Sequence, residues 1–191
     1  MSFELAEPPA LEPVSLAQLK ARLRISHDEE DARLNQVISA SRQRVEAECG
    51  LALIAQTWIE RLDDWSQFGR LSAFGTRFRL GRAPVIAVES IRVFPARGEA
   101  SLWPQSAYEI IAGQSAAWLQ VKPGGCFPTV GRSANGVELR YRAGFGASRS
   151  DVPPDLLEAC CSLAEALYQG DVDALPGTVQ TLLQPWRRVV L

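Results

Sequence analysis

The sequence predicts an α+β fold: mainly a helical bundle of two N-terminal and two C-terminal helices, with an inserted antiparallel β region. Apolar residues recur with a helical period near both ends of the chain, and with a period of two between Gln56 and Gly146. We therefore assign residues 1–54 to the N-terminal part of the bundle, 55–150 to the β insertion and 151–191 to the C-terminal part.

The first helix is predicted to follow a loose leader. Ser15 and Gln18 have the spacing of a capping box, in which each side chain bonds the other residue's backbone amide. Leu16, Leu19 and Leu23 follow at helical spacing. The sequence thus predicts a short helix that starts at Ser15.

A second, longer helix is predicted to begin near the carboxylates at residues 28–31, because negative charge is favourable at the positive end of the helix dipole. Gly50 stands where a left-handed cap would end this helix. Its apolar stripe consists of Leu34, Val37, Ile38, Ser41, Val45 and Cys49.

Short β-favouring segments separated by turn residues fill the middle of the chain. They are Thr57–Leu62, Arg77–Leu80, Val85–Phe94, Tyr108–Ile111, Trp118–Val121 and Val137–Tyr141. In the last segment Val137, Leu139 and Tyr141 alternate with charged residues, which predicts one buried and one solvent-facing side.

Two more helices are predicted after residue 151. Pro154 suits the first turn of the third helix, where a missing amide costs nothing, and Gly170 suits its end. A short fourth helix is expected to be capped by Thr178 and to stop before Pro185, where the chain should leave the bundle.

The composition is that of a soluble globular protein, with 47% hydrophobic and 22% charged residues among 191. No apolar run approaches the roughly 20 residues that span a bilayer, and the leader through Pro13 is acidic and proline-rich, unlike a signal peptide. We expect no membrane association, and synthesis in the bacterial cytoplasm. Charge is divided along the chain: residues 1–64 have a net charge of -5, residues 65–150 of +7 and residues 151–191 of -4.

No set of residues predicts catalysis. The four cysteines (Cys49, Cys126, Cys160, Cys161) lack C-x-x-C spacing, and the single histidine, His27, lies far from them in sequence. His27 and the carboxylates after it fit a solvated helix start, and Cys160 fits packing on a helix. Walker and G-x-G-x-x-G sequences are absent, so we expect no enzyme, no cofactor and no metal site.

A nucleic-acid-binding or DNA-packaging accessory domain is the alternative hypothesis. Aromatic side chains could stack on bases while the arginines of the basic middle contact phosphate. The candidates are Trp58, Trp65, Trp103, Trp118 and Trp186. The net charge of -2 and the lack of a clustered basic run argue against it. An enzyme with an unrecognised site is a third hypothesis.

Taken as an ordered string, the residues resemble the head-tail connector (adaptor) proteins of tailed phages, prophages and gene transfer agents. The stretches that carry the resemblance are 13–25, 27–31, 34–38, 45–53, 56–58, 84–91, 108–109, 141–146, 152–156 and 182–187. They cover most of the chain in the family's order.

The resemblance implies a structural subunit of a ring, usually a dodecamer, in the neck of a virion or phage-like particle. Its partners would be the portal protein, a stopper or tail-completion protein and further copies of itself, with DNA passing through the lumen without sequence-specific binding. The family contributes no catalytic or cofactor residue. In such a ring, the basic middle of one subunit could contact an acidic helical end of the next.

The portal-binding residues are predicted at the C terminus, where an aromatic anchor, two arginines and three aliphatic residues follow a helix-ending proline. These residues are Pro185, Trp186, Arg187, Arg188, Val189, Val190 and Leu191. The alternative is that Trp186 and Val189 fold back on their own bundle.

Overall fold

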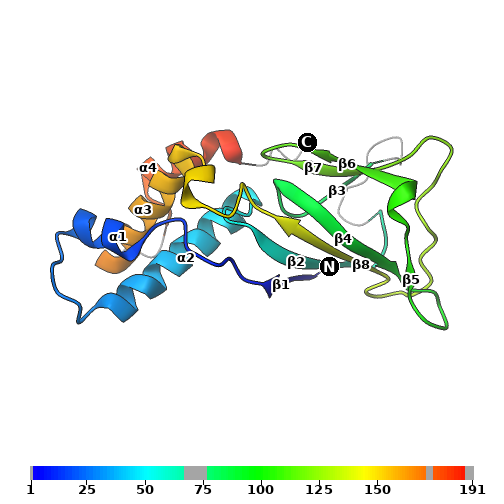
Figure 1. Ribbon diagram of the computed structural model, residues 1–191, viewed down its shortest axis with the longest axis horizontal. Helices are drawn as coiled ribbons and strands as arrows, with labels where there is room; N and C mark the ends of the chain where they lie inside the picture. Colours follow the sequence, from blue (N-terminus) through cyan, green and yellow to red (C-terminus); the bar gives the residue numbers. More distant parts are fainter. Residues whose placement is uncertain (1, 67–76, 171–173, 188–191) are drawn as a thin grey trace. The chain divides into compact units, whose positions relative to one another are not determined.

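The structure, a computed structural model, describes residues 2–66, 77–170 and 174–187. The chain divides into two compact units (Figure 1). Residues 9–54 and 145–191 form one, which we call the helical unit, and residues 1–8 and 55–144 form the other, the β unit. The mixed α+β class is confirmed.

The helical unit contains the four predicted helices. They are α1 (Leu16–Leu23), α2 (Asp31–Cys49), α3 (Pro154–Gln169) and α4 (Gly177–Leu183). Fully buried leucines and isoleucines, including Leu19, Leu34, Ile38, Leu156 and Leu163, form the core of this unit.

The predicted helix caps are confirmed at three positions. The Ser15 hydroxyl accepts from the Gln18 amide at 3.2 Å, and the Gln18 side chain accepts from the Ser15 amide at 2.9 Å. Gly50 (φ 66°) and Gly170 (φ 91°) end α2 and α3 in the left-handed conformation, which glycine adopts without steric cost. The predicted Thr178 cap is wrong: Pro176 precedes the first residue of α4, and no side chain caps that end.

The β unit consists of two antiparallel sheets. A five-stranded sheet has the order β1-β2-β8-β4-β5, and a three-stranded sheet the order β3-β7-β6. The strands are β1 (Ser2–Glu7), β2 (Gln56–Leu62), β3 (Arg77–Arg79), β4 (Val85–Val93), β5 (Ser101–Leu102), β6 (Tyr108–Ala112), β7 (Ala117–Val121) and β8 (Val137–Ala143). In Figure 1 the smaller sheet is drawn on the β4 side of the larger sheet, away from β1.

All six predicted strands are present, and Val137, Leu139 and Tyr141 face the core as expected. Two strands were not predicted. β5 has only two residues, and β1 lies in the leader that we expected to be loose. β1 forms because it pairs with β2, more than 50 residues away, and no local pattern encodes that pairing.

The boundaries of the units therefore differ from those assigned by sequence. Residues 1–8 group with the strands through the β1–β2 pairing. Residues 145–150 group with the helices, because the Phe145 amide donates to the Leu53 carbonyl at 3.1 Å and Gly146 bridges Ile54. Among the described residues, no helix combines the length and apolar character that a membrane span requires.

Candidate interaction surfaces

The reactive groups of the sequence are separated from one another. His27 is exposed, with its Nδ1 3.0 Å from a carboxylate oxygen of Glu29. Cys160 is fully buried, and burial raises the pKa of its thiol well above the usual value. Burial also raises the pKa of the half-buried Cys161. In the described part of the chain, no three His, Cys, Asp or Glu side chains gather as a metal site would require.

A cluster of buried charged side chains connects three segments of the helical unit. Arg42 and Glu46, one turn apart on α2, are 3% and 2% exposed, and their Nη1 and Oε2 atoms lie 2.8 Å apart. Arg42 also pairs with Glu12 at 2.7 Å, and Glu46 accepts from the Leu53 amide at 2.8 Å. The cluster of Glu12, Arg42 and Glu46 thus ties the segments before α1 and after α2 to the middle of α2.

Sequence analysis missed this cluster, although a signal was present. Ile38, Arg42 and Glu46 follow one another at i, i+4 spacing, so the charged pair continues a row that begins with a buried residue. A charged pair in such a row lies beside the apolar stripe of the helix.

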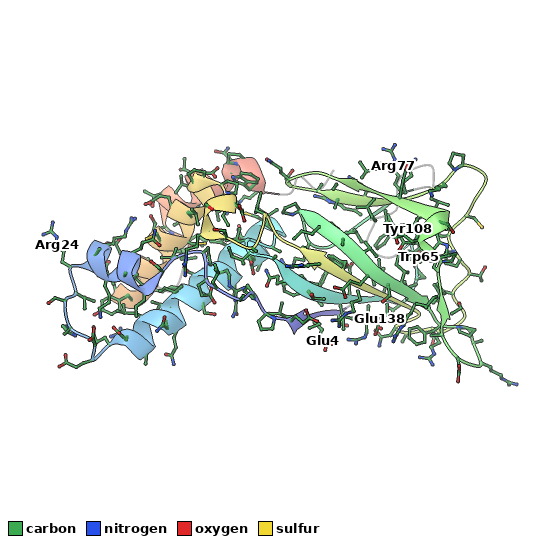
Figure 2. The ribbon with its side chains drawn as sticks, in the orientation of Figure 1. Glu4, Arg24, Trp65, Arg77, Tyr108 and Glu138 are labelled. Carbon is green, nitrogen blue, oxygen red and sulfur yellow. The ribbon has the colours of Figure 1, made fainter. Side chains whose placement is uncertain are left out.

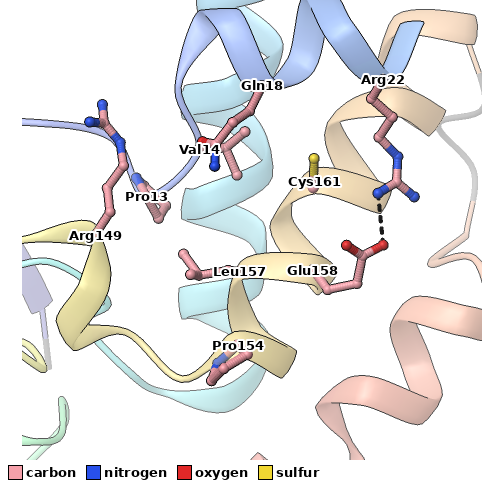
Figure 3. A pocket seen from close by; sticks show the side chains of 9 residues that line it. All are labelled: Pro13, Val14, Gln18, Arg22, Arg149, Pro154, Leu157, Glu158 and Cys161. Atoms are coloured by element: carbon pink, nitrogen blue, oxygen red, sulfur yellow. Dashed lines mark hydrogen bonds and ion pairs between the residues drawn. The ribbon is translucent and has the colours of Figure 1, made fainter.

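A pocket of about 360 Å³ opens on the surface of the helical unit, between α1, α3 and the segment before α1 (Figure 3). Its lining is mixed, with Pro13, Val14, Gln18, Pro154, Leu157 and Cys161 among the residues that face it. The lining thus combines apolar side chains with polar ones, and burial, by raising the pKa of the Cys161 thiol, favours its protonated form.

Arg22 stands at the edge of this pocket and joins α1 to α3. Its guanidinium lies 2.7 Å from Glu158 (Figure 3). It also lies 2.6 Å from Glu165 and donates to Ser162 at 3.0 Å. The hydrogen bond from Arg22 lowers the pKa of the Glu158 carboxyl. A second pocket, which Leu182 and Thr181 of α4 line, also contains Arg22 and Glu158, so the same ion pair borders both.

The predicted portal-binding segment follows α4, and its first three residues lie on the helical unit. Residues Gln184–Trp186 form a 3₁₀ turn that continues α4. Trp186 donates from Nε1 to Asp155 at 2.6 Å and packs edge-on against Phe145, with ring centroids 5.7 Å apart. Arg187 pairs with Glu48.

The prediction that the chain leaves the bundle at Pro185 is therefore wrong. The chain stays on the helical unit through Arg187, the last residue that the structure describes. The 3₁₀ turn tolerates proline because the first amides of a helical turn need no intrahelical partner. Arg188, Val189, Val190 and Leu191 lie outside the described residues, and their role in portal binding stays a prediction.

Three of the five candidate tryptophans are unavailable for stacking on bases. Trp58, Trp65 and Trp103 are buried, at most 9% exposed. Trp65 and Trp103 belong to an aromatic cluster with Phe78, Tyr108 and Phe127, with ring centroids 4.8 to 5.6 Å apart; Figure 2 labels Trp65 and Tyr108. Trp118 and Trp186 are half-buried, so the aromatic argument for a nucleic-acid surface is reduced to these two side chains.

The basic character of the middle of the chain is partly neutralised within the β unit. Arg61 pairs with Glu4 at 2.6 Å and with Glu138 at 2.9 Å, and Figure 2 labels both carboxylates. Arg140 pairs with Glu7 at 2.6 Å and with Glu89 at 2.7 Å. Because the acidic residues of β1 join this unit, it contains 11 basic and 9 acidic residues, against 9 and 13 in the helical unit.

Among the described residues, the polar networks thus connect elements within each unit, and the two pockets lie on the surface of the helical unit. Residues 13–68 match the family model described as phage gp6-like head-tail connector protein. The resemblance to head-tail connectors that the sequence suggests is confirmed. The search among curated proteins finds no significant match.

Similar solved structures come from gene transfer agent (GTA) particles. A chain in the virion of the native GTA particle is 25% identical with a TM-score of 0.82, over 100% of this chain and 97% of that chain. A chain in the neck of the native particle, computed with C12 symmetry, is 27% identical with a TM-score of 0.74, over 98% and 97%. A chain in the neck of the empty particle, computed with C6 symmetry, shares the fold at a TM-score of 0.83 and 24% identity, over 100% and 97%.

Proposed function

We propose that this protein is a structural head-tail connector (adaptor) subunit without enzymatic activity. Copies form a ring, a dodecamer by the C12 symmetry of the similar neck, that joins the portal protein to the stopper or tail-completion protein. The ring continues the channel through which packaged DNA passes, in the neck of a virion or phage-like particle.

One observation carries the proposal. The similarity to chains of the native GTA particle extends over 98–100% of this chain, so it includes the β unit as well as the helical unit. The family match over residues 13–68 alone would leave most of the β unit unexplained.

Electron microscopy and native mass measurement of the purified protein, alone and mixed with its portal, test the proposal. We expect rings of uniform copy number stacked coaxially on the portal. A monomer that ignores the portal, and binds free DNA with an affinity that falls steeply with salt, would reject the connector in favour of a nucleic-acid-binding domain.

Within this function, we propose that the last four residues, Arg188 to Leu191, anchor the ring to the portal while Pro185, Trp186 and Arg187 aim them. The support is the packing of Trp186 and Arg187 on the helical unit, which places the start of the anchor on a rigid support. Removing residues 188–191 should leave the melting temperature unchanged and abolish portal binding.

A matched pair of variants separates anchoring from stability. Truncation after Gln184 should lower the melting temperature as well as abolish binding, because it also removes the Trp186 hydrogen bond and ring contact. Trp186→Ala should lower stability and weaken, without abolishing, portal binding in the folded fraction, because residues 188–191 remain but are no longer aimed. Full portal affinity after removal of residues 188–191 would move the anchor elsewhere on the helical unit.

A further inference from the structure

Among the described residues, all four large apolar side chains that are exposed lie on strands with an open hydrogen-bonding edge. They are Phe3 (38% exposed) on β1, Ile86 (48%) on β4, Leu102 (65%) on β5 and Ile111 (39%) on β6. Exposed apolar residues beside unpaired backbone groups favour pairing with another strand.

The five-stranded sheet has such an edge on each side. On one side β1 pairs only with β2. On the other side β5 covers β4 only at Arg92 and Val93, and the Trp103 amide adds a bond to Ile91 at 2.9 Å. From Val85 to Ser90, the edge of β4 has no strand partner in the part of the chain that the structure describes.

The two open edges match in direction. Successive neighbours in the sheet are antiparallel, so β1 and β5 run in the same direction, opposite to β4. In a copy rotated about an axis along the strands, residues 4–7 of β1 would lie level with residues 87–90 of β4, continue the row that β5 begins and run antiparallel to β4. Ser2 and Phe3 would lie level with Arg92 and Ile91, which β5 and the Trp103 amide already bind, so these two residues would have to turn aside.

The side chains match as well. Through the register of β1, β2, β8 and β4, Leu5 lies level with Val88 and Glu4 lies level with Ser90. Rotation would therefore bring Leu5 beside Val88 on the buried face. It would also bring Glu4 near Arg92, whose contact within its own chain, to Glu138, is loose at 3.7 Å.

We propose that residues 4–7 of β1 in one copy pair antiparallel with residues 87–90 of the open β4 edge in the next copy, so that a second copy of this chain covers both open edges. The inference rests on the proposed ring, because a head-to-tail contact between two different surfaces repeats around a closed ring. Main-chain hydrogen bonds would provide the affinity of this contact, and Leu5 and Glu4 its register.

A disulfide between the two strands tests the contact directly. Within one copy, residues of β1 and β4 at one level are three strand spacings apart, about 14 Å, because β2 and β8 lie between them. A disulfide needs Cα atoms closer than about 7 Å, so a bond between these strands must join two copies. Glu4→Cys combined with Ser90→Cys, in a Cys126→Ser background that removes an exposed thiol, is the suitable variant.

After oxidation of assembled rings, we expect a covalent ladder on a non-reducing gel, reaching the copy number of the ring. Either substitution alone should give none, and neither should Glu4→Cys with Glu109→Cys, an exposed position on β6 of the other sheet. Ile86→Lys gives an independent readout: it should leave the melting temperature unchanged and lower ring assembly at least tenfold, whereas Ile111→Lys on β6 should not.

The outcomes separate this inference from the proposed function. Rings that form normally, yet give no ladder and tolerate Ile86→Lys, would overturn the strand contact and leave the connector standing. Assembly lost through Ile111→Lys but not through Ile86→Lys would overturn it too, and would place the contact on the three-stranded sheet. A protein that forms no ring, alone or on the portal, would reject both.

Discussion

The helical unit and the β unit each bury a carboxylate, but they satisfy it differently. In the helical unit, Glu46 pairs with Arg42 one turn away on the same helix. In the β unit, the fully buried Glu60 accepts hydrogen bonds from the Tyr141 hydroxyl and the Gly81 amide, each at 3.0 Å, which come from distant parts of the chain. A buried carboxylate on a helix can find its partner one turn away on the same helix, whereas a buried carboxylate on a strand finds its partners only when distant segments have folded together.

The two units also differ in how they hold the N-terminal segment. Glu12 is 30% exposed but binds Arg42, which is buried, so this attachment is partly shielded from water. Glu4 and Glu7 of β1 bind Arg61 and Arg140 at the surface, where water and salt weaken the attraction. This difference predicts a firmly held segment before α1 and a weakly held β1, which suits a strand that also contacts a neighbouring copy.

The largest expected effect is that of Glu46→Gln. It leaves the buried Arg42 with Glu12 as its remaining carboxylate, so the loss should approach but not exceed the roughly 3–5 kcal/mol of unfolding free energy that a fully broken buried pair costs. Urea unfolding followed by far-UV circular dichroism measures the loss. Glu29→Gln, on an exposed side chain, is the control and should change nothing measurable; equal effects would show that the cluster contributes no stability.

Tyr141→Phe tests the other unit and should cost less, about 1–3 kcal/mol, because it removes hydrogen bonds but breaks no ion pair. The hydroxyl accepts from the Arg82 amide at 3.1 Å and donates to Glu60. Tyr108→Phe is the matched control for Tyr141→Phe. Tyr108 is also a buried tyrosine of the β unit, but its hydroxyl has no hydrogen-bond partner among the described residues. If Tyr108→Phe proved the more destabilising, the Glu60 network would not be what stabilises the sheet.

Arg22→Gln should have a smaller effect, below about 1 kcal/mol at neutral pH, because the group is partly exposed and screened. The stabilisation that Arg22 provides should depend on pH, because it acts through the Glu158 carboxylate. Arg22 lowers the folded-state pKa of Glu158 from its ordinary 4.5, so the stabilisation is present above that value and is lost as pH falls through the folded pKa.

The difference in stability between wild type and Arg22→Gln should therefore shrink between pH 5 and pH 3. Thermal melts across this range measure it. A difference independent of pH would show that Arg22 acts through packing alone.

The smallest effect is expected from Glu7→Gln at the surface of the β unit. The variant should unfold like the wild type at high salt, because the Arg140–Glu7 pair is screened there, and slightly earlier at low salt. Hydrogen exchange of the β1 amides is the sensitive readout, and it should speed up selectively. An effect as large as that of Glu46→Gln would remove the contrast between the two attachments.

Local chemistry made the helices and most strands predictable. The helix caps at Ser15, Gly50 and Gly170 depend only on contacts within one helical turn. They can therefore be recognised from neighbouring residues in the sequence. The alternation of Val137, Leu139 and Tyr141 likewise needs no partner to be recognised. The ordered resemblance to connectors likewise predicted a structural subunit from the sequence.

Only the tertiary structure decided how distant segments meet. β1 becomes a strand because β2 offers an edge, and Glu12 is bound because Arg42 is buried; neither partner can be found within a local window. The chain follows the helical unit through Trp186 because Asp155 and Phe145 provide a site that Pro185 alone does not reveal. The physical reason is the same in each case: burial and long-range pairing determine these positions, and they exist only after the chain has folded.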